Sequence, residues 1–504
     1  MTTDEAHFAS TGKPGFVERH SVWNQAQQAA AEALLTAGLP EVDLIRVGFG
    51  DPHGLLRTKA LSPRAFRSAL LNGLDMSPGP LVFDSGHALP NDVFAPGAGL
   101  GLPELTGAGD FIVVPDPLTL RVSDCGGVRT AVVLGDEYTR AGLAHPLSSR
   151  GVLRRVLGSA AAREIRPLIG LELEWYLLRL LDPADRGGVG GFGVQGRAPH
   201  VTTVNGGYQF NSDTLIADLL PVLGPLGRLL SDELGLPLRS IEHESGPGQI
   251  EVTFDPLGAL EAADAILLAR SLMKQHCLRT GHLATFMSVP GFAGADPSGW
   301  HLHQSLTDSR GVNLFTSYSD DQPLSDLGLS YVAGLLEHGA ATTSLAVPTV
   351  NGYRRLDPVN SLSPDRLVWS HENRGAMVRV LGGPHDVASH VENRLGEPAA
   401  NPYLYIASQL AAGLDGIDRG LRRPEAAQPH AETAAALPTD LGQATEALRG
   451  SELVRALLGD PLHANLLALH GSSWDRFGKW STDHAGDTGS GVTAWENDEY
   501  LMAY

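Results

Sequence analysis

The chain has 504 residues, a formal net charge of −20 at pH 7, 42% hydrophobic residues and 19% charged residues. This composition supports a sizeable core and excludes global disorder, and the length favours more than one domain. The negative charge argues against nucleic acid or an anionic membrane surface as a main partner.

Cysteine content and the N-terminal sequence bear on the compartment. The two cysteines, Cys125 and Cys277, make a disulfide framework implausible and favour a reducing compartment. The N-terminus lacks a basic segment followed by an apolar one, and no run of about 18 apolar residues occurs. We therefore expect a soluble, cytoplasmic protein without a membrane-spanning segment.

The N-terminal part is predicted to contain a helix and then a small β-rich region. Residues 1–20 are polar and expected to be loose, and a helix follows with Ser21 as N-cap and Gly38 at its end. Short β-like runs between Gly and Pro turns continue to about residue 134. These runs are residues 42–49, 80–84, 110–116 and 130–134.

The remainder alternates predicted strands with long helices. A helix over residues 149–165 leads into "LIGLELEWYLL", residues 168–178, whose composition and length indicate a strand. The Gly-rich residues 181–200 are expected to form a loop rather than a phosphate-binding turn, because no strand-to-helix context surrounds them. Long helices are predicted over residues 257–282 and 402–421.

Two carboxylates stand inside the apolar strand of residues 168–178. Glu172 and Glu174 are two positions apart, so on a strand they share one face. Burial and mutual repulsion both oppose the ionisation of such a pair. Divalent cations beside the pair would reverse that balance. An exposed strand face is the alternative that the pair alone leaves open.

Further acidic and imidazole side chains follow in similar patterns. Glu244 and Glu251 flank a Gly-Pro-Gly turn, which brings both carboxylates to the same space if it joins two strands. His301 and His303 also share a strand face, and Glu392 is a further carboxylate among apolar and basic residues. Oxygen-rich ligands with one imidazole suit Mg²⁺ or Mn²⁺ rather than zinc. Taken singly, each histidine is more often a structural residue than a ligand, and the Gly-Pro-Gly segment is usually a simple turn.

The order of these segments resembles glutamine synthetase over nearly the whole chain. The motifs that carry the resemblance are "GLELEWYLL", "HESGPGQIEVTF", "GWHLHQSL", "NGYRRLDP", "ENRGAMVRV" and "VENRLGEPAANPYLYIA". Six ordered motifs are far more specific than a single Gly-rich pattern.

The resemblance implies an α+β fold. Its parts would be an N-terminal extension with a helix (1–40), a β-grasp-like domain (41–145) and a catalytic domain (146–504) on a curved antiparallel sheet flanked by helices. It also implies a homododecamer of two hexameric rings, with each site between neighbouring subunits. No nucleic acid or membrane partner is expected.

The resemblance also implies a metal set and a reaction. Two or more Mg²⁺ or Mn²⁺ ions would be held, one by Glu174, Glu244 and Glu251, and another by Glu172, His301 and Glu392. ATP would phosphorylate the side-chain carboxylate of glutamate to γ-glutamyl phosphate, and an amine would then displace phosphate. Phosphoryl transfer between two anions needs charge neutralisation, which metals and arginines supply.

Four arginines and two further residues fall on the family's substrate positions. Arg355, Arg374 and Arg394 would bind glutamate, and Arg379 would bind the ATP phosphates. Arg374 and Arg379 would also be catalytic, with Arg374 at the transferring phosphoryl group. His303 and Ser305 would contact the nucleotide. For the arginines, surface salt bridges are the alternative.

The amine end departs from the family pattern. Ammonia-using members have a Glu shortly after the Lys-Arg-Leu-x-Pro motif, whereas here no Glu occurs between Leu356 and His371, and Ser361 or Leu362 takes its place. Tyr208, Asp84 and Ser361 are the predicted amine-pocket residues. The sequence also has Asp296-Pro297, Trp300, Val387 and His390 where the family has other residues.

These observations predict a ligase that joins the γ-carboxylate of glutamate to an amine larger than ammonia. Polyamines, ethanolamine and other monoamines are the candidates, in amine utilisation or detoxification and nitrogen metabolism. One alternative is a true glutamine synthetase whose base is Asp357 or Asp365. A second is a non-catalytic assembly or regulatory protein, which the intact metal and arginine sets disfavour. A ligase acting on an acid other than glutamate is a third.

Overall fold

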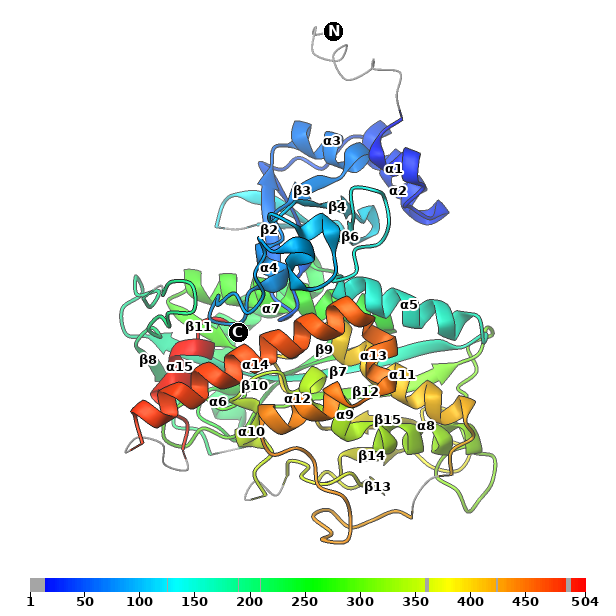
Figure 1. Ribbon diagram of the computed structural model, residues 1–504. Helices are drawn as coiled ribbons and strands as arrows, with labels where there is room; N and C mark the ends of the chain where they lie inside the picture. Colours follow the sequence, from blue (N-terminus) through cyan, green and yellow to red (C-terminus); the bar gives the residue numbers. More distant parts are fainter. Residues whose placement is uncertain are drawn as a thin grey trace, which may run out of the picture.

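Figure 1 shows a computed structural model of the chain, with a smaller N-terminal part above a larger part built on a second sheet. The structure describes residues 14–124, 126–188, 190–208, 210–358, 362–422, 425–485 and 491–504. The fold is mixed α and β with curved sheets, as predicted from the sequence.

The N-terminal part is a six-stranded sheet with strand order β2-β1-β6-β4-β3, and β5 pairs with β6. The central pair β1–β6 is parallel and the other pairs are antiparallel. The strands are β1 (Leu44–Gly50), β2 (Leu56–Leu61), β3 (Leu74–Met76), β4 (Phe111–Pro115), β5 (Arg121–Asp124) and β6 (Arg129–Tyr138). The helices are α1 (Phe16–His20), α2 (Gln25–Thr36), α3 (Pro63–Asn72) and α4 (Gly79–Val82).

Three details of this part differ from the predictions. A short helix, α1, occupies residues that were expected to be loose, and Ser21 ends it in the left-handed region (φ 50°). The next helix begins after Asn24, because Asn24 and Gln27 form a reciprocal capping box. Residues 80–84 were predicted as a strand, but Pro80 stands in the first turn of α4, where a missing N–H costs nothing.

The larger part is a nine-stranded sheet with order β13-β14-β15-β12-β7-β10-β9, to which β8 and β11 add by pairing with β7. Only the short β13–β14 pair is parallel. The strands are β7 (Arg166–Leu180), β8 (Val201–Thr203), β9 (Leu238–His243), β10 (Gln249–Gly258), β11 (His282–Thr285), β12 (Trp300–Thr307), β13 (Trp369–His371), β14 (Val378–Leu381) and β15 (His390–Asn393).

Helices cover this sheet and connect it to the N-terminal part (Figure 1). α5 and α7 contact both sheets, and α11 packs on α5, α7 and α8. The helices are α5 (Ser149–Ala161), α6 (Asp213–Arg228), α7 (Ala259–Arg279), α8 (Asp326–Glu337), α9 (Gly339–Ala346), α10 (Gly352–Arg355), α11 (Pro402–Asp418), α12 (Leu441–Arg449), α13 (Glu452–Leu458), α14 (Asp460–Asp483) and α15 (Ala494–Tyr500).

One helical stretch among the described residues has the length and apolar composition of a membrane span. It covers Asp213–Glu233, which is α6 and the turn after it. Leu219, Leu223 and Leu226 of α6 are buried within the protein, and α6 packs against β9. Length and composition alone are weak support for a span, because core helices have the same features.

Candidate functional site

The long central strand β7 presents its carboxylates on one face. Glu172 and Glu174 alternate with Leu171, Leu173 and Trp175, which are almost completely buried in the core. The strand therefore divides into an apolar face and an acidic face, as its alternation predicted.

Neighbouring strands bring further polar side chains to this acidic face. On β10, Glu251 lies directly opposite Glu174, and on β12, His301 lies directly opposite Glu172. One strand further out, Glu392 of β15 is paired with His303 of β12. Glu244 stands in the turn between β9 and β10, where its N–H donates to the carbonyl of Gln249. The sheet thus brings together all the residues that the sequence assigned to metals.

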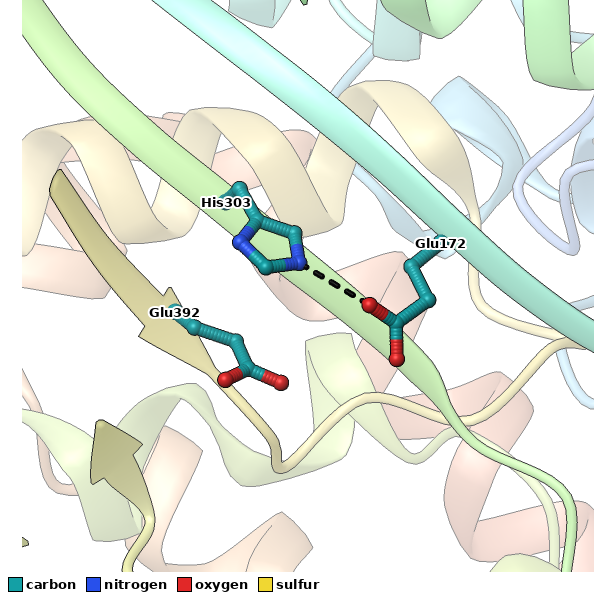
Figure 2. A group of neighbouring side chains, drawn as sticks. All are labelled: Glu172, His303 and Glu392. Carbon is teal, nitrogen blue, oxygen red and sulfur yellow. Dashed lines mark hydrogen bonds and ion pairs between the residues drawn. The ribbon is translucent and has the colours of Figure 1, made fainter. Parts of the chain in front are cut away.

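The side chains contact one another closely. His301 Nδ1 lies 2.5 Å from Glu172 Oε1 and 3.7 Å from Glu392 Oε1, and His301 Nε2 lies 3.9 Å from Glu174 Oε1. His303 Nε2 lies 3.1 Å from the other oxygen of Glu172 (Figure 2). Glu251, His301 and Glu392 are buried, and Glu172 and Glu174 are half-buried.

Two cavities meet at this cluster. A cavity of about 620 Å³ is lined by His303, Ser305 and His390, and one of about 490 Å³ by Glu174, Glu244 and His301. Both cavities are lined by the same three carboxylates: Glu172, Glu242 and Glu251. The acidic cluster therefore forms the boundary between two spaces of substrate size.

Burial and crowding disfavour ionised carboxylates here. Burial, with the negative charge of Glu244, raises the pKa of Glu174 to about 8. Burial, with the charge of Glu172, raises the pKa of Glu244 to about 7 and that of Glu251 to about 10. Such a cluster is costly unless a cation lies among the carboxylates.

The donor chemistry fits hard divalent cations. One ligand atom each from Glu172, Glu251 and His301 lies within 4.8 Å of the others, and the same holds for Glu172, His303 and Glu392. Carboxylate oxygens with a single imidazole are the ligands that Mg²⁺ and Mn²⁺ accept. Figure 2 shows the second group, which contains His303, assigned to the nucleotide from the sequence, in place of the predicted His301.

Three predicted arginines line the smaller cavity: Arg355, Arg374 and Arg394. Arg355 and Arg394 are buried, whereas Arg374 is exposed. Arg355 donates through Nη2 to the carbonyl of Arg394 (2.7 Å), and burial lowers its pKa to about 10. Arg379 lines neither cavity, because its Nη1 and Nη2 bind Glu392 at 3.2 Å and Glu372 at 2.7 Å.

The predicted nucleotide residues His303 and Ser305 both line the larger cavity. Two positions that depart from the family line it too, namely Val387, which is 74% exposed, and His390, whose Nε2 lies 3.1 Å from His303 Nδ1.

Of the predicted amine-pocket residues that the structure describes, Tyr208 and Asp84 do not line the smaller cavity. Tyr208 donates its N–H to the carbonyl of Ser245 at 2.6 Å, but its side chain is 81% exposed. Asp84 is buried in the N-terminal part, where its carboxylate accepts from Arg476 (2.9 Å) and Ser472 (2.7 Å). Ser361 lies outside the described residues.

Glu242 and Phe210 also line the smaller cavity, and neither was predicted from the sequence. Glu242 stands two positions before Glu244 at the end of β9, so the alternation that revealed Glu172 and Glu174 was available for it as well. Phe210 is 63% exposed beside the cavity, and no sequence pattern pointed to it.

Comparisons with known proteins agree with this geometry. Residues 146–486 match the family model for the glutamine synthetase catalytic domain. A γ-glutamylanilide synthase of an Acinetobacter species is 40% identical, covering 97% of this chain and 99% of the relative. Glutamine synthetase of Methanococcus maripaludis is 30% identical, covering 78% of this chain and 84% of the relative. The solved structure titled "Apo GmaS without ligand" has a TM-score of 0.73 at 25% identity, and the match covers 91% of this chain and 99% of that structure's chain. This chain belongs to the glutamine synthetase family.

Proposed function

We propose that this glutamine synthetase-like γ-glutamyl ligase joins the γ-carboxylate of L-glutamate to an aromatic amine of the aniline type, with ATP and through γ-glutamyl phosphate. The observation that carries the proposal is the wall of the smaller cavity. Phe210 and Leu362 line this cavity and are 63% and 69% exposed, and Leu362 stands in the segment where ammonia-using members have a Glu. The relative named γ-glutamylanilide synthase supports the same acceptor class.

The charge of the acceptor explains why a Glu is dispensable. Ammonia, polyamines and ethanolamine are cations at pH 7, so an enzyme for them benefits from a carboxylate that attracts the amine and takes its proton. Anilines are neutral at pH 7 and present an apolar ring. Apolar side chains such as Phe210 and Leu362 suit that ring, whereas they offer no charge or hydrogen bond to a hydrated ammonium ion.

In this proposal the acidic cluster holds two or more Mg²⁺ or Mn²⁺ ions. The ligands would be Glu174, Glu244 and Glu251 for one ion, and Glu172, His301 and Glu392 for another. When bound, the ions neutralise the phosphate charge that builds up during phosphoryl transfer.

The arginines would supply the remaining positive charge. Arg355 and Arg394 are buried at the smaller cavity, where planar guanidinium groups bind the carboxylates of glutamate. Arg374, exposed at the same cavity, would stabilise the transferring phosphoryl group. Arg379 would reach the ATP phosphates by exchanging its bond to the partly exposed Glu372. His303 and Ser305 would contact the nucleotide in the larger cavity.

The assembly belongs to the same proposal. Residues 1–40, 41–145 and 146–504 would be the extension, the β-grasp-like domain and the catalytic domain. Twelve chains would form two hexameric rings. Asp84 of one chain would approach the amine pocket of the next, beside Tyr208 and Ser361, by exchanging its bonds to Ser472 and Arg476. The reaction would serve amine utilisation or detoxification, within the nitrogen metabolism of the family.

An acceptor panel tests the proposal. Phosphate release from ATP is measured with glutamate, Mg²⁺ and one of aniline, ammonia, methylamine, ethanolamine or a polyamine. Aniline is expected to give the highest kcat/KM, with γ-glutamylanilide as the product. The Leu362→Glu variant is expected to gain activity with ammonia, and Leu362→Gln, which has similar size but no charge, is not. Ammonia as the best acceptor of the natural chain would overturn the aromatic specificity.

A further inference from the structure

The attacking amine nitrogen has to lose a proton, and the sequence places no Glu in the segment where ammonia-using relatives carry one. The smaller cavity has another carboxylate, Asp296, at a position where the sequence departs from the family. Asp296 lies in the connection between β11 and β12, ahead of His301.

The backbone of Asp296 is fixed from the acidic strand itself. The hydroxyl of Tyr176 donates to the carbonyl of Asp296 at 2.8 Å and accepts from its N–H at 2.8 Å. Tyr176 is buried on β7 and shares the face of Glu172 and Glu174. Pro297 further restricts the residue before it to extended conformations. The backbone of Asp296 is therefore held at a fixed position relative to the acidic cluster.

One oxygen of the Asp296 carboxylate is free to accept a hydrogen bond. Its Oδ2 accepts from the hydroxyl of Ser245 at 2.6 Å, and its Oδ1 has no hydrogen-bond partner among the described residues. The side chain is half-buried at the cavity wall. A general base has to lie within hydrogen-bond reach of the proton that it removes, and Oδ1 at the cavity wall is free for such a contact.

The other carboxylates of this cavity are less suited. Glu172, Glu174, Glu244 and Glu251 belong to the proposed metal set. Glu242 accepts from Ser240 at 2.7 Å and also lines the larger cavity, at the nucleotide end. Asp296 does not line the larger cavity, and it shares the smaller one with Phe210 and Leu362, the proposed acceptor wall.

We propose that Asp296 is the general base of the second half-reaction, an inference that rests on the proposed function. The amine lone pair attacks the γ-carbonyl carbon of γ-glutamyl phosphate, the new C–N bond forms, and the bond from carbon to the phosphate oxygen breaks. Inorganic phosphate leaves with the electron pair of that bond. The nitrogen transfers one proton to the Asp296 carboxylate, which releases it to solvent.

The test separates the two half-reactions. Asp296→Asn preserves shape and is expected to lower kcat with aniline about 100-fold, a usual size for the loss of a general base. Formation of γ-glutamyl phosphate is followed without amine, as ¹⁸O exchange from the bridging to the non-bridging β-phosphate positions of ATP. That exchange is expected to stay within about threefold of the natural chain. The control is Asp218→Asn, which removes a charge from the exposed face of α6 and is expected to change neither rate.

Chemical rescue tests the carboxylate directly. In Asp296→Ala, added formate is expected to restore turnover with aniline, because it supplies the missing carboxylate. Turnover of Asp296→Asn within threefold of the natural chain would overturn the assignment. Loss of isotope exchange in Asp296→Asn together with no rescue by formate would also overturn it, because the residue would then only maintain shape.

Failure of the proposed function gives a different pattern. If ammonia is the best acceptor, the aromatic specificity is wrong, but a selective loss of ammonia turnover in Asp296→Asn still supports the base. If the natural chain turns over no amine at all, both proposals are wrong.

Discussion

Glu251 shows how crowded, buried carboxylates need a bound cation in order to be ionised. It lies opposite Glu174 on the neighbouring strand, and burial with surrounding negative charge raises its pKa to about 10. Without metal the side chain is therefore neutral at pH 7, and the neutral amide in Glu251→Gln is expected to change the melting temperature in EDTA by less than about 2 °C.

With metal, the same substitution is expected to be costly. Loss of one ionised ligand should raise the Mg²⁺ concentration for half-maximal glutamate-dependent ATP turnover at least about tenfold, and most of the thermal stabilisation by Mg²⁺ should disappear. Thermal unfolding and a Mg²⁺ titration measure the two effects. An unchanged Mg²⁺ dependence would contradict the assignment of Glu251.

Glu397 provides a pH dependence away from the cluster of proposed metal ligands. It is buried and accepts from the N–H and the hydroxyl of Thr349, both at 2.8 Å, and burial raises its pKa to about 8. Between the usual pKa of about 4.5 and 8, the folded state holds a proton that the unfolded chain releases. The free energy of unfolding therefore falls as the pH rises through this window.

The Glu397→Gln variant removes that contribution. It is expected to be as stable as the natural chain at pH 4.5 and more stable by roughly 4 kcal/mol at pH 8.5. Urea unfolding of both proteins at the two pH values checks this. An equal difference at both pH values would show that the carboxyl does not titrate in this window.

Strand alternation predicted which carboxylates share a face of β7, but not which residues lie opposite them on the neighbouring strands. The spacing of Glu172 and Glu174 was sufficient to place both on one face of β7, as the structure has them. Which residue lies opposite each one depends on strand register, which is set by distant segments. The convergence of β7, β10, β12 and β15 was therefore available only through the family resemblance.

At the scale of elements, α8 and α11 cross with their backbones nearly in contact. A Cβ at Gly416 would lie 2.2 Å from the carbonyl oxygen of Ser330, which is too close for any side chain. Gly416→Ala is expected to destabilise the protein by about 2 kcal/mol or more, since the helices must separate.

Gly158 on α5 is the matched control. It is exposed within a helix, and a Cβ there meets nothing within 4 Å. Gly158→Ala is expected to stabilise the protein by about 0.5–1 kcal/mol, because Ala favours the helical state. Differential scanning calorimetry of both variants compares them, and a shift of the same sign in both would contradict the close crossing.

Element boundaries were the least predictable level. Ser21 and Asn24 are both good caps, and the choice of Asn24 depends on its reciprocal bond with Gln27, which propensity alone does not reveal. The long strand β7 and the long helices α7 and α11 were predicted within a few residues, because periodicity over many positions outweighs local ambiguity.

At the scale of the whole molecule, the acidic cluster separates two cavities, one proposed for the nucleotide and the other for the amino acid and amine. Phosphoryl transfer across such a boundary would bring the γ-phosphate and the glutamate carboxylate together at the shared carboxylates Glu172, Glu242 and Glu251. The net charge of −20 makes this local arrangement of arginines essential for anionic substrates.

Assembly is the prediction that belongs to this scale. The chain has a mass of 53.3 kDa, so twelve copies would have a mass of about 640 kDa by multiplication. Mass photometry is expected to show this species. In size-exclusion chromatography, glutamate-dependent ATP turnover should elute in the same fractions. Full activity in a species of single-chain mass would contradict a site shared between subunits.

A direct competition tests the central claim. The natural chain is given glutamate, ATP and Mg²⁺ with aniline and ammonia together at equal concentration, and both amides are quantified by mass spectrometry. γ-Glutamylanilide is expected to exceed glutamine at least about tenfold, the ratio that corresponds to about 1.4 kcal/mol of discrimination between the two transition states. Glutamine as the main product would contradict it.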